Sequence, residues 1–191
     1  GLSDVLQSAV PPTIDFFKSL PTLPNDALVW GIYALVFEKE DQLPKLYIGS
    51  GTESKIGLRD RFRDYNRGDF TDLPSKCLKK GWTEKHRGLL CWSSIPPEID
   101  IPLQRLRFLA IEATLAFAFS VVRNRPQKTD DVWSEIVPWP QATFPWAPLC
   151  THSAFWEVPR GIDKINITSE ELEERKAMQA QRKYCLTCHR N

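Results

Sequence analysis

The chain has 191 residues, 42% of them hydrophobic, and 25 Lys and Arg residues nearly balance 24 Asp and Glu residues to give a net charge of +1. This length and apolar content are enough for one domain with a real core and additional segments. The near-neutral charge argues against a protein that binds nucleic acid through bulk electrostatics alone, because such domains are usually clearly basic.

Nothing in the sequence indicates a membrane or secreted protein. No apolar run approaches the roughly 18 residues that a membrane span needs, and the N-terminus lacks a basic start followed by an apolar stretch and a cleavage site. We therefore expect no membrane partner and an intracellular location, nuclear or cytoplasmic. The five cysteines are an odd number in a chain large enough to fold without staples, which favours reduced thiols or a metal site over a disulfide framework.

The first 26 residues are expected to form a helical leader that packs on the main domain. Two short helices are predicted, one capped by Ser3 and the other by Thr13, with Pro11 and Pro12 between them.

An antiparallel hairpin is predicted next. Residues 27–37 and 45–49 are rich in Val, Ile, Trp, Tyr and Phe, and the polar segment between them contains Pro44, which suits strand, turn and strand. The unbroken apolar character of the first strand indicates that both of its faces are covered and that it is central in its sheet. Gly31 and Gly49 then mark positions where another backbone or a ligand approaches closely, or plain bulges.

Three further elements follow the hairpin. Residues 57–67 are predicted to form a short charged helix, because their apolar residues recur at helical spacing, and residues 89–95 a third strand. Asp100 and Pro102 suit the start of a long apolar helix that runs from residue 103 to about 121. Basic side chains gather between the hairpin and the third strand, and they are either a solvated charged surface or a local basic patch: Arg59, Arg61, Arg63, Arg67, Lys76, Lys79, Lys80, Lys85 and Arg87.

Glu112 is the one carboxylate in the apolar part of the long helix. A helix that is apolar nearly all round is expected to be buried. A buried carboxylate must be paired, bind a metal or take up a proton. An ion pair with Arg105, Arg107 or a neighbouring element and a functional site therefore both remain open.

Residues 27–126 resemble a GIY-YIG nuclease domain. The resemblance rests on the two words Gly31-Ile32-Tyr33 and Tyr47-Ile48-Gly49 and on further residues in the family's order. It implies a set of catalytic residues: Tyr33, Tyr47, Arg61, Tyr65, Glu112 and Asn124. The interval from Tyr47 to Arg61 is a few residues longer than in compact members of the family, so Arg59 is an alternative to Arg61.

The resemblance implies a metal-dependent DNA endonuclease, with DNA that is branched or otherwise structured among its candidate substrates. Glu112 would hold Mg²⁺ or Mn²⁺ and Arg61 would clamp the phosphate. Tyr33 would act as a general base or position water, for which a phenol of pKa near 10 needs a nearby cation. Which tyrosine takes the proton stays open. DNA binding is expected from exposed basic residues: Arg59, Arg63, Arg67, Lys79 and Lys80.

Residues 127–191 are expected to be an irregular Pro- and Trp-rich, then helical, extension. Its aromatic residues suit packing on the nuclease domain, with base stacking as the alternative. Residues 169–183 are predicted to form a helix whose capping box joins Thr168 and Glu171. Cys185 and Cys188 are half of a structural zinc site, for which Cys150 and His152 are candidates for the other half, or else they are ordinary thiols.

The sequence therefore predicts an α+β fold in which a small three-stranded sheet is flanked by helices. Two rival functions remain. One is a nucleic-acid-binding or interaction module on a decayed nuclease scaffold. The other is a structure-selective nuclease subunit that is active only in a complex, with a protein partner or a second copy of the chain.

Overall fold

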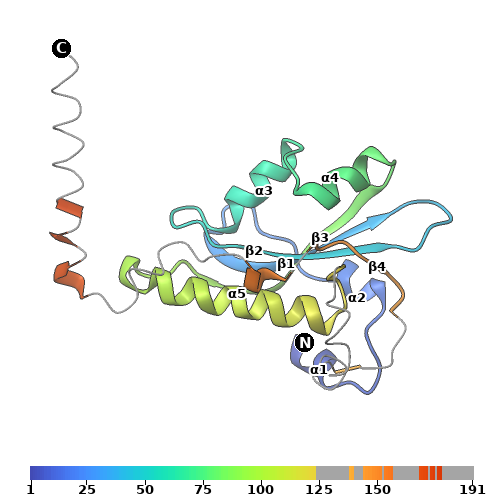
Figure 1. The fold of residues 1–191 in the computed structure, drawn as a ribbon, viewed down its shortest axis with the longest axis horizontal. Helices are drawn as coiled ribbons and strands as arrows, with labels where there is room; N and C mark the ends of the chain where they lie inside the picture. The colour runs from blue at the N-terminus through green and yellow to red at the C-terminus, as the bar shows by residue number, and fades with distance from the viewer. Residues whose placement is uncertain are drawn as a thin grey trace, which may run out of the picture.

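A four-stranded mixed sheet with helices on both faces forms the body of the computed structural model (Figure 1). The structure describes residues 1–123, 138–139, 144–151, 153–156, 168–171, 173–174 and 176–177. The strand order is β3-β1-β2-β4. The strands are β1 (Val29–Glu38), β2 (Lys45–Gly51), β3 (Thr83–Ser94) and β4 (Ala147–Pro148). The α+β prediction is confirmed.

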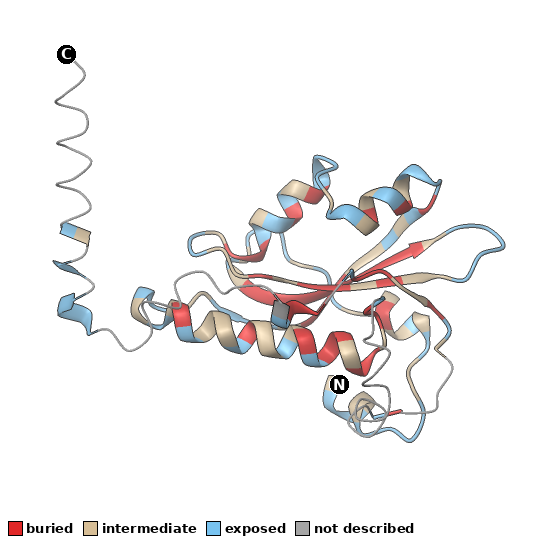
Figure 2. Cartoon of the chain, in the orientation of Figure 1, coloured by how far each residue is buried: buried red, intermediate tan, exposed pale blue. Residues whose placement is uncertain are grey.

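The hairpin is confirmed, and its first strand is central as predicted. β1 pairs antiparallel with β2 on one side and with β3 on the other. Eight of its ten residues are buried between two half-buried ends, and Figure 2 shows the corresponding band of buried residues through the middle of the sheet. Both faces of β1 are therefore covered, which explains its continuous apolar sequence.

The prediction of a three-stranded sheet was wrong. β4 adds a fourth strand, which runs parallel to β2 with Ala147 opposite Lys45 and Pro148 opposite Leu46. It uses backbone groups that the outer edge of β2 would otherwise leave unpaired, as in the bond from the Leu149 N–H to the Leu46 carbonyl at 3.0 Å. The proline has no N–H to give, which is tolerated on an edge strand.

Helices cover both faces of the sheet (Figure 1). One face carries α3 (Leu58–Asn66) and α4 (Asp72–Lys79). The other carries α1 (Leu2–Leu6), α2 (Ile14–Lys18) and α5 (Ile101–Ala118), with the short 3₁₀ helices η1 (Glu98–Asp100) and η2 (Ala154–Trp156). Side chains alternate along β1, so Ile32, Ala34 and Val36 enter the core beneath α5 while Tyr33, Leu35 and Phe37 enter the core beneath α3.

Two element predictions need correction. The third strand begins at Thr83 rather than at residue 89, because the charged residues before Leu89 lie on the strand as well. The long helix ends at Ala118, and the expectation that it is buried all round was wrong: Leu103 is 43% exposed and Ile111 is 40% exposed. Only one side of α5 is covered by the sheet, so its apolar composition overstates its burial.

The leader and the described part of the extension both join the core beneath α5. Phe17 of α2 is fully buried, and its ring meets those of Phe119 and Trp146 edge-on at 5.1 and 5.2 Å. The predicted packing of these segments on the main domain is thus confirmed where the structure describes them. The predicted capping box is present as well, with reciprocal bonds between Thr168 and Glu171. Among the described residues, no helix is both long and apolar enough to cross a membrane.

Candidate active site

Three tyrosines from three different elements meet on the α3 side of the sheet. Tyr33 of β1 lies opposite Gly49 of β2, and Tyr47 stands two residues away on the same face of β2. Tyr65 comes from the last turn of α3. The hydroxyls of Tyr33 and Tyr65 share a hydrogen bond of 2.6 Å, and the ring centroids of Tyr33 and Tyr47 are 6.2 Å apart. Strand alternation and helix spacing together bring these three predicted residues into one cluster.

Gly49 has no side chain because the tyrosines occupy the space above it. A Cβ atom built at Gly49 would lie 2.7 Å from the Tyr33 hydroxyl oxygen and 2.7 Å from the Cε1 atom of Tyr47. At Gly31, the corresponding atom would meet Leu58 Cδ2 at 3.1 Å and the Cys91 carbonyl oxygen at 3.3 Å. Both glycines of the two sequence words thus permit close packing against α3 or its tyrosine cluster, and neither is a plain bulge.

We expect Gly49→Ala to lower any activity of this site by about 100-fold, because a displacement of about 1 Å at a catalytic group costs that much. Overpacking should also reduce the free energy of unfolding by about 1–3 kcal/mol. Cleavage kinetics and urea unfolding measure the two effects. Gly31→Ala is the matched control, since its Cβ needs a smaller adjustment and touches none of the tyrosines. An equal loss of activity in both variants would mean that the effect is general destabilisation.

Arg61 is the arginine of α3 that acts on this cluster. It lies one helical turn before Tyr65, and its side chain is exposed. Partial burial of the guanidinium acts to lower the pKa of Arg61, but the nearby Tyr33, Tyr65 and Tyr47 side chains, with the Asp64 carboxylate, outweigh it and raise that pKa above its ordinary value. In return, the charge of Arg61 acts to lower the pKa values of Tyr33 and Tyr65.

Burial nevertheless keeps the phenols protonated. It is the largest cause that raises the pKa of Tyr33 well above its ordinary value, with Tyr47 and Tyr65 adding to the shift and Arg61 opposing it. Burial likewise raises the pKa values of Tyr47 and Tyr65. The nearby cation that a tyrosine base requires is present as Arg61, but alone it does not bring Tyr33 into the neutral pH range. A further positive charge at the site would be needed for that.

These raised pKa values predict a loss of stability in alkali. Between the pKa of an unfolded tyrosine, about 10, and its higher folded value, the folded protein holds more protons than the unfolded one, so stability falls as pH rises through this window. Urea unfolding at increasing pH from 8 upwards should show this decline, and Tyr33→Phe should make it shallower. The same slope in both proteins would show that Tyr33 does not titrate as a buried phenol.

Glu112 of α5 acts on the cluster through its effect on Tyr47. It shares the sheet-facing side of the helix with Phe108, Leu115 and Ala116, but it is half-buried rather than enclosed. Its charge contributes to the raised pKa of Tyr47, after burial and the nearby Tyr65 and Cys150. Glu112 has an interaction partner within the protein, as does Arg105, which also donates from Nε and Nη2 to the Thr52 carbonyl at 3.3 and 3.2 Å.

The described residues offer few protein ligands for a divalent ion at Glu112. Among the described residues, no three His, Cys, Asp or Glu side chains gather into a group that could hold a metal ion. From the described residues, an ion here would gain at most two such side chains, with water and phosphate among its other ligands. Mg²⁺ is often bound in this way, because it keeps several waters and uses one or two carboxylates.

Of the candidate zinc ligands, only Cys150 is among the described residues, because Cys185, Cys188 and His152 lie outside them. Asn124 of the predicted catalytic set lies outside them as well. Cys150 is buried at the outer edge of β2, where its Sγ donates to the Ile48 carbonyl at 3.3 Å and accepts from the Ile48 N–H at 3.4 Å. Burial raises the pKa of the Cys150 thiol to about 12, with the charge of Glu112 adding to the shift. This cysteine is a packed core residue whose thiol bonds to the backbone of β2.

The basic residues predicted to bind DNA are all exposed: Arg59, Arg63, Arg67, Lys79 and Lys80. Two of them have acidic neighbours. Arg63 pairs with Asp60, and Arg67 pairs with Asp64 at 2.6 Å. Such exposed pairs contribute little free energy, so both arginines stay available to a phosphate.

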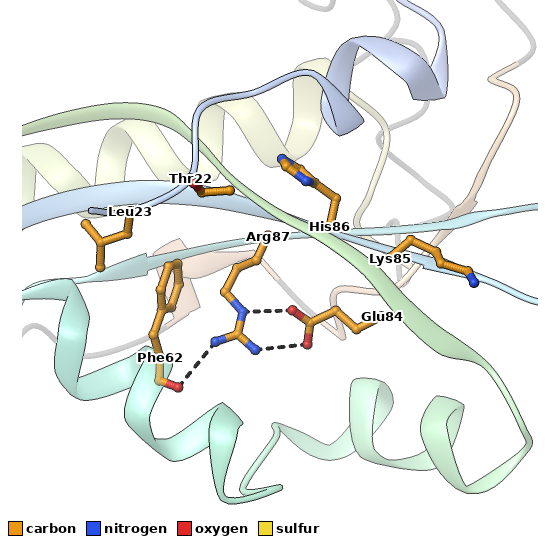
Figure 3. Close-up of a pocket in the computed structure, with 7 residues that line it drawn as sticks. All are labelled: Thr22, Leu23, Phe62, Glu84, Lys85, His86 and Arg87. Atoms are coloured by element: carbon orange, nitrogen blue, oxygen red, sulfur yellow. Dashed lines mark hydrogen bonds and ion pairs between the residues drawn. The ribbon is translucent and has the colours of Figure 1, made fainter. Parts of the chain in front are cut away.

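Arg87, which sequence analysis grouped with the basic patch, instead fastens α3 to β3. Figure 3 shows its guanidinium between the carboxylate of Glu84, bound through two bonds of 2.8 and 3.0 Å, and the carbonyl of Phe62 at 3.2 Å. It also lies over the rings of Phe62 and Tyr65, at 4.8 and 5.3 Å from their centroids. These groups border an open pocket of about 340 Å³. The sequence alone carried no signal for this role, because Phe62, through which Arg87 reaches α3, lies 25 residues away along the chain.

Comparison with known proteins identifies no relative: no family model matches the sequence, no curated protein matches it, and no solved structure matches the fold.

Proposed function

We propose that the chain is a metal-dependent DNA endonuclease with GIY-YIG-type chemistry. The observation that carries the proposal is that Tyr33, Tyr47 and Tyr65 meet on the α3 side of the sheet, where the charges of Arg61 and Glu112 act on them. Hydrolysis of a phosphodiester requires an activated water, neutralisation of the negative charge on the phosphoryl oxygens and a stabilised leaving oxygen. Hydroxyls, a guanidinium and a carboxylate are suited to these tasks.

Each side chain has a part that follows from its surroundings. Arg61 is exposed beside the hydroxyls, so its planar donors would hold the scissile phosphate against them. Tyr33 and Tyr65 share a hydrogen bond, which fixes the Tyr33 hydroxyl in a position to orient the attacking water or accept its proton. Glu112 would hold a divalent ion, which supplies charge neutralisation and a bound water of lowered pKa.

Purified protein incubated with linear duplex, branched and single-stranded DNA tests the proposal. We expect cleavage of at least one of these substrates in Mg²⁺ or Mn²⁺ and none in EDTA. A preparation of Arg61→Ala, purified in the same way, is the control for contamination. Equal cleavage by both preparations would assign the activity to another nuclease.

Two other outcomes would redirect the assignment. Binding of DNA without cleavage of any substrate would favour the binding-module alternative. Cleavage that appears only after addition of a cell extract, and that the Arg61→Ala protein does not support, would favour a nuclease subunit that requires a partner.

A further inference from the structure

Trp92 is a large aromatic side chain that is exposed to solvent near the end of β3. It is 54% exposed, although most of the other tryptophans whose side chains the structure describes are buried, as Trp30, Trp82, Trp139 and Trp146 are. It sits in a regular strand, opposite Gly31 of β1. An exposed aromatic on a rigid strand beside a candidate active site is a feature that the cluster of tyrosines and Arg61 does not account for.

A β-bulge turns Trp92 toward the tyrosine side of the sheet. Tyr33 pairs with Leu89 and Ile32 pairs with Cys91, so Leu90 has no partner on β1. Leu89 enters the core beneath α3, whereas Leu90 and Cys91 both pack into the core beneath α5. Two successive side chains on one face reverse the alternation, and the next residue, Trp92, therefore faces α3. Bulges beside active sites commonly re-aim a side chain in this way.

The ring stands close to the cluster and to a basic residue. Gly31 precedes Tyr33 by two residues on the same face of β1, a distance of about 7 Å, and strands lie about 5 Å apart. The Cα atoms of Trp92 and Tyr33 are thus roughly 9 Å apart. A Cβ at Gly31 would meet both the Trp92 Cβ, at 3.7 Å, and Leu58 of the first turn of α3. The exposed Arg59 follows Leu58 in the same turn.

We propose that Trp92 is a stacking platform for an unpaired DNA base next to the scissile phosphate. The exposed Arg59 supplies a positive charge for the adjoining phosphate. A stacked base in a duplex presents no open face to an indole, so the proposal commits the site to DNA with a single-stranded or splayed nucleotide at the cut. It rests on the proposed endonuclease function and narrows its substrate class.

A duplex with a short unpaired flap tests this proposal, because the junction fixes the position of each unpaired base. Abasic sites replace the unpaired bases one at a time, and fluorescence anisotropy in EDTA gives the affinity of the uncut DNA. For the wild-type protein, one abasic position should weaken binding by about 5- to 150-fold, the effect of losing one base stack. In Trp92→Ala, affinity for the intact flap should fall by a similar factor, and the same abasic site should have no further effect.

Two variants separate stacking from other causes. Trp92→Phe keeps an aromatic face and should retain most of the affinity and of the abasic effect. Phe155→Ala removes an aromatic side chain that is 57% exposed on η2 and should leave both unchanged. Equal abasic effects in wild type and Trp92→Ala, or an equal loss in Phe155→Ala, would overturn the proposal. If the stacking proposal fails but the wild-type protein cuts DNA, the proposed endonuclease function still stands. If the wild-type protein cuts nothing, the binding comparison between wild type and Trp92→Ala still tests the role of Trp92.

Discussion

Arg61→Ala is expected to lower kcat/KM for DNA cleavage by about 1,000-fold, whereas Arg59→Ala should change it only a few-fold. Loss of a charged donor that stabilises a transition state typically costs two to five orders of magnitude. Arg61 has this position, because its charge acts on both Tyr33 and Tyr65. Arg59 is exposed near the start of the same helix, where it would contact a phosphate outside the reacting centre.

The two arginines should also differ in salt dependence and in a direct titration. Arg59→Ala should weaken DNA binding uniformly and reduce the slope of log affinity against log salt by about one. Arg61→Ala should raise the pKa of Tyr65 further, which ultraviolet absorbance of the phenolate measures without any substrate. Arg61→Lys retains the charge but not the planar fork, so it should recover only part of the rate. A larger loss of cleavage in Arg59→Ala than in Arg61→Ala would transfer the role to Arg59.

Local patterns in the sequence were enough to predict the elements that carry the tyrosines. The hairpin follows from two apolar runs around a polar turn, and α3 follows from the helical spacing of Leu58, Phe62 and Tyr65, all of which are buried. Convergence of the tyrosines then requires only that both strand tyrosines share the face that α3 covers. The sequence words therefore predicted which residues meet, although not the hydrogen bond between Tyr33 and Tyr65.

Features that depend on distant pairing were beyond the sequence. β4 is two residues long and contains Pro148, so it lacks every local signal of a strand. It forms because the outer edge of β2 offers unpaired backbone groups. The bulge at Leu90 cannot be predicted from the sequence either, since an apolar run looks the same with or without a shift of register. The exposed position of Trp92 on the tyrosine side depends on that shift.

Burial of the long helix was overestimated for a related reason. Composition reports how many apolar residues a helix has, but not how much surface is available to cover them. The sheet covers one side of α5, and the exposed Leu103 and Ile111 lie away from it. Glu112 is consequently half-buried, and a half-buried carboxylate loses less hydration than one enclosed in the core.

Glu112→Gln is therefore expected to lower cleavage by about 1,000-fold or more while leaving the fold intact. The amide preserves the size of the side chain but removes the charge that a divalent ion needs, so Mn²⁺ affinity, measured by electron paramagnetic resonance of the free ion, should fall with the rate. Loss of a charge beside the buried Tyr47 and Cys150 should leave the midpoint of thermal unfolding unchanged or slightly raised.

A structural ion pair would give the opposite pattern for Glu112→Gln. Removing one partner of such a pair strands the other charge, so the free energy of unfolding would fall and Mn²⁺ affinity would not change. Glu98→Gln is the matched control, since Glu98 is 57% exposed near the start of α5 and pairs with Lys176 at 2.5 Å. Its substitution should affect neither cleavage nor Mn²⁺ binding. Because stability and metal affinity move in different directions under the two explanations, one variant decides whether Glu112 serves the fold or the site.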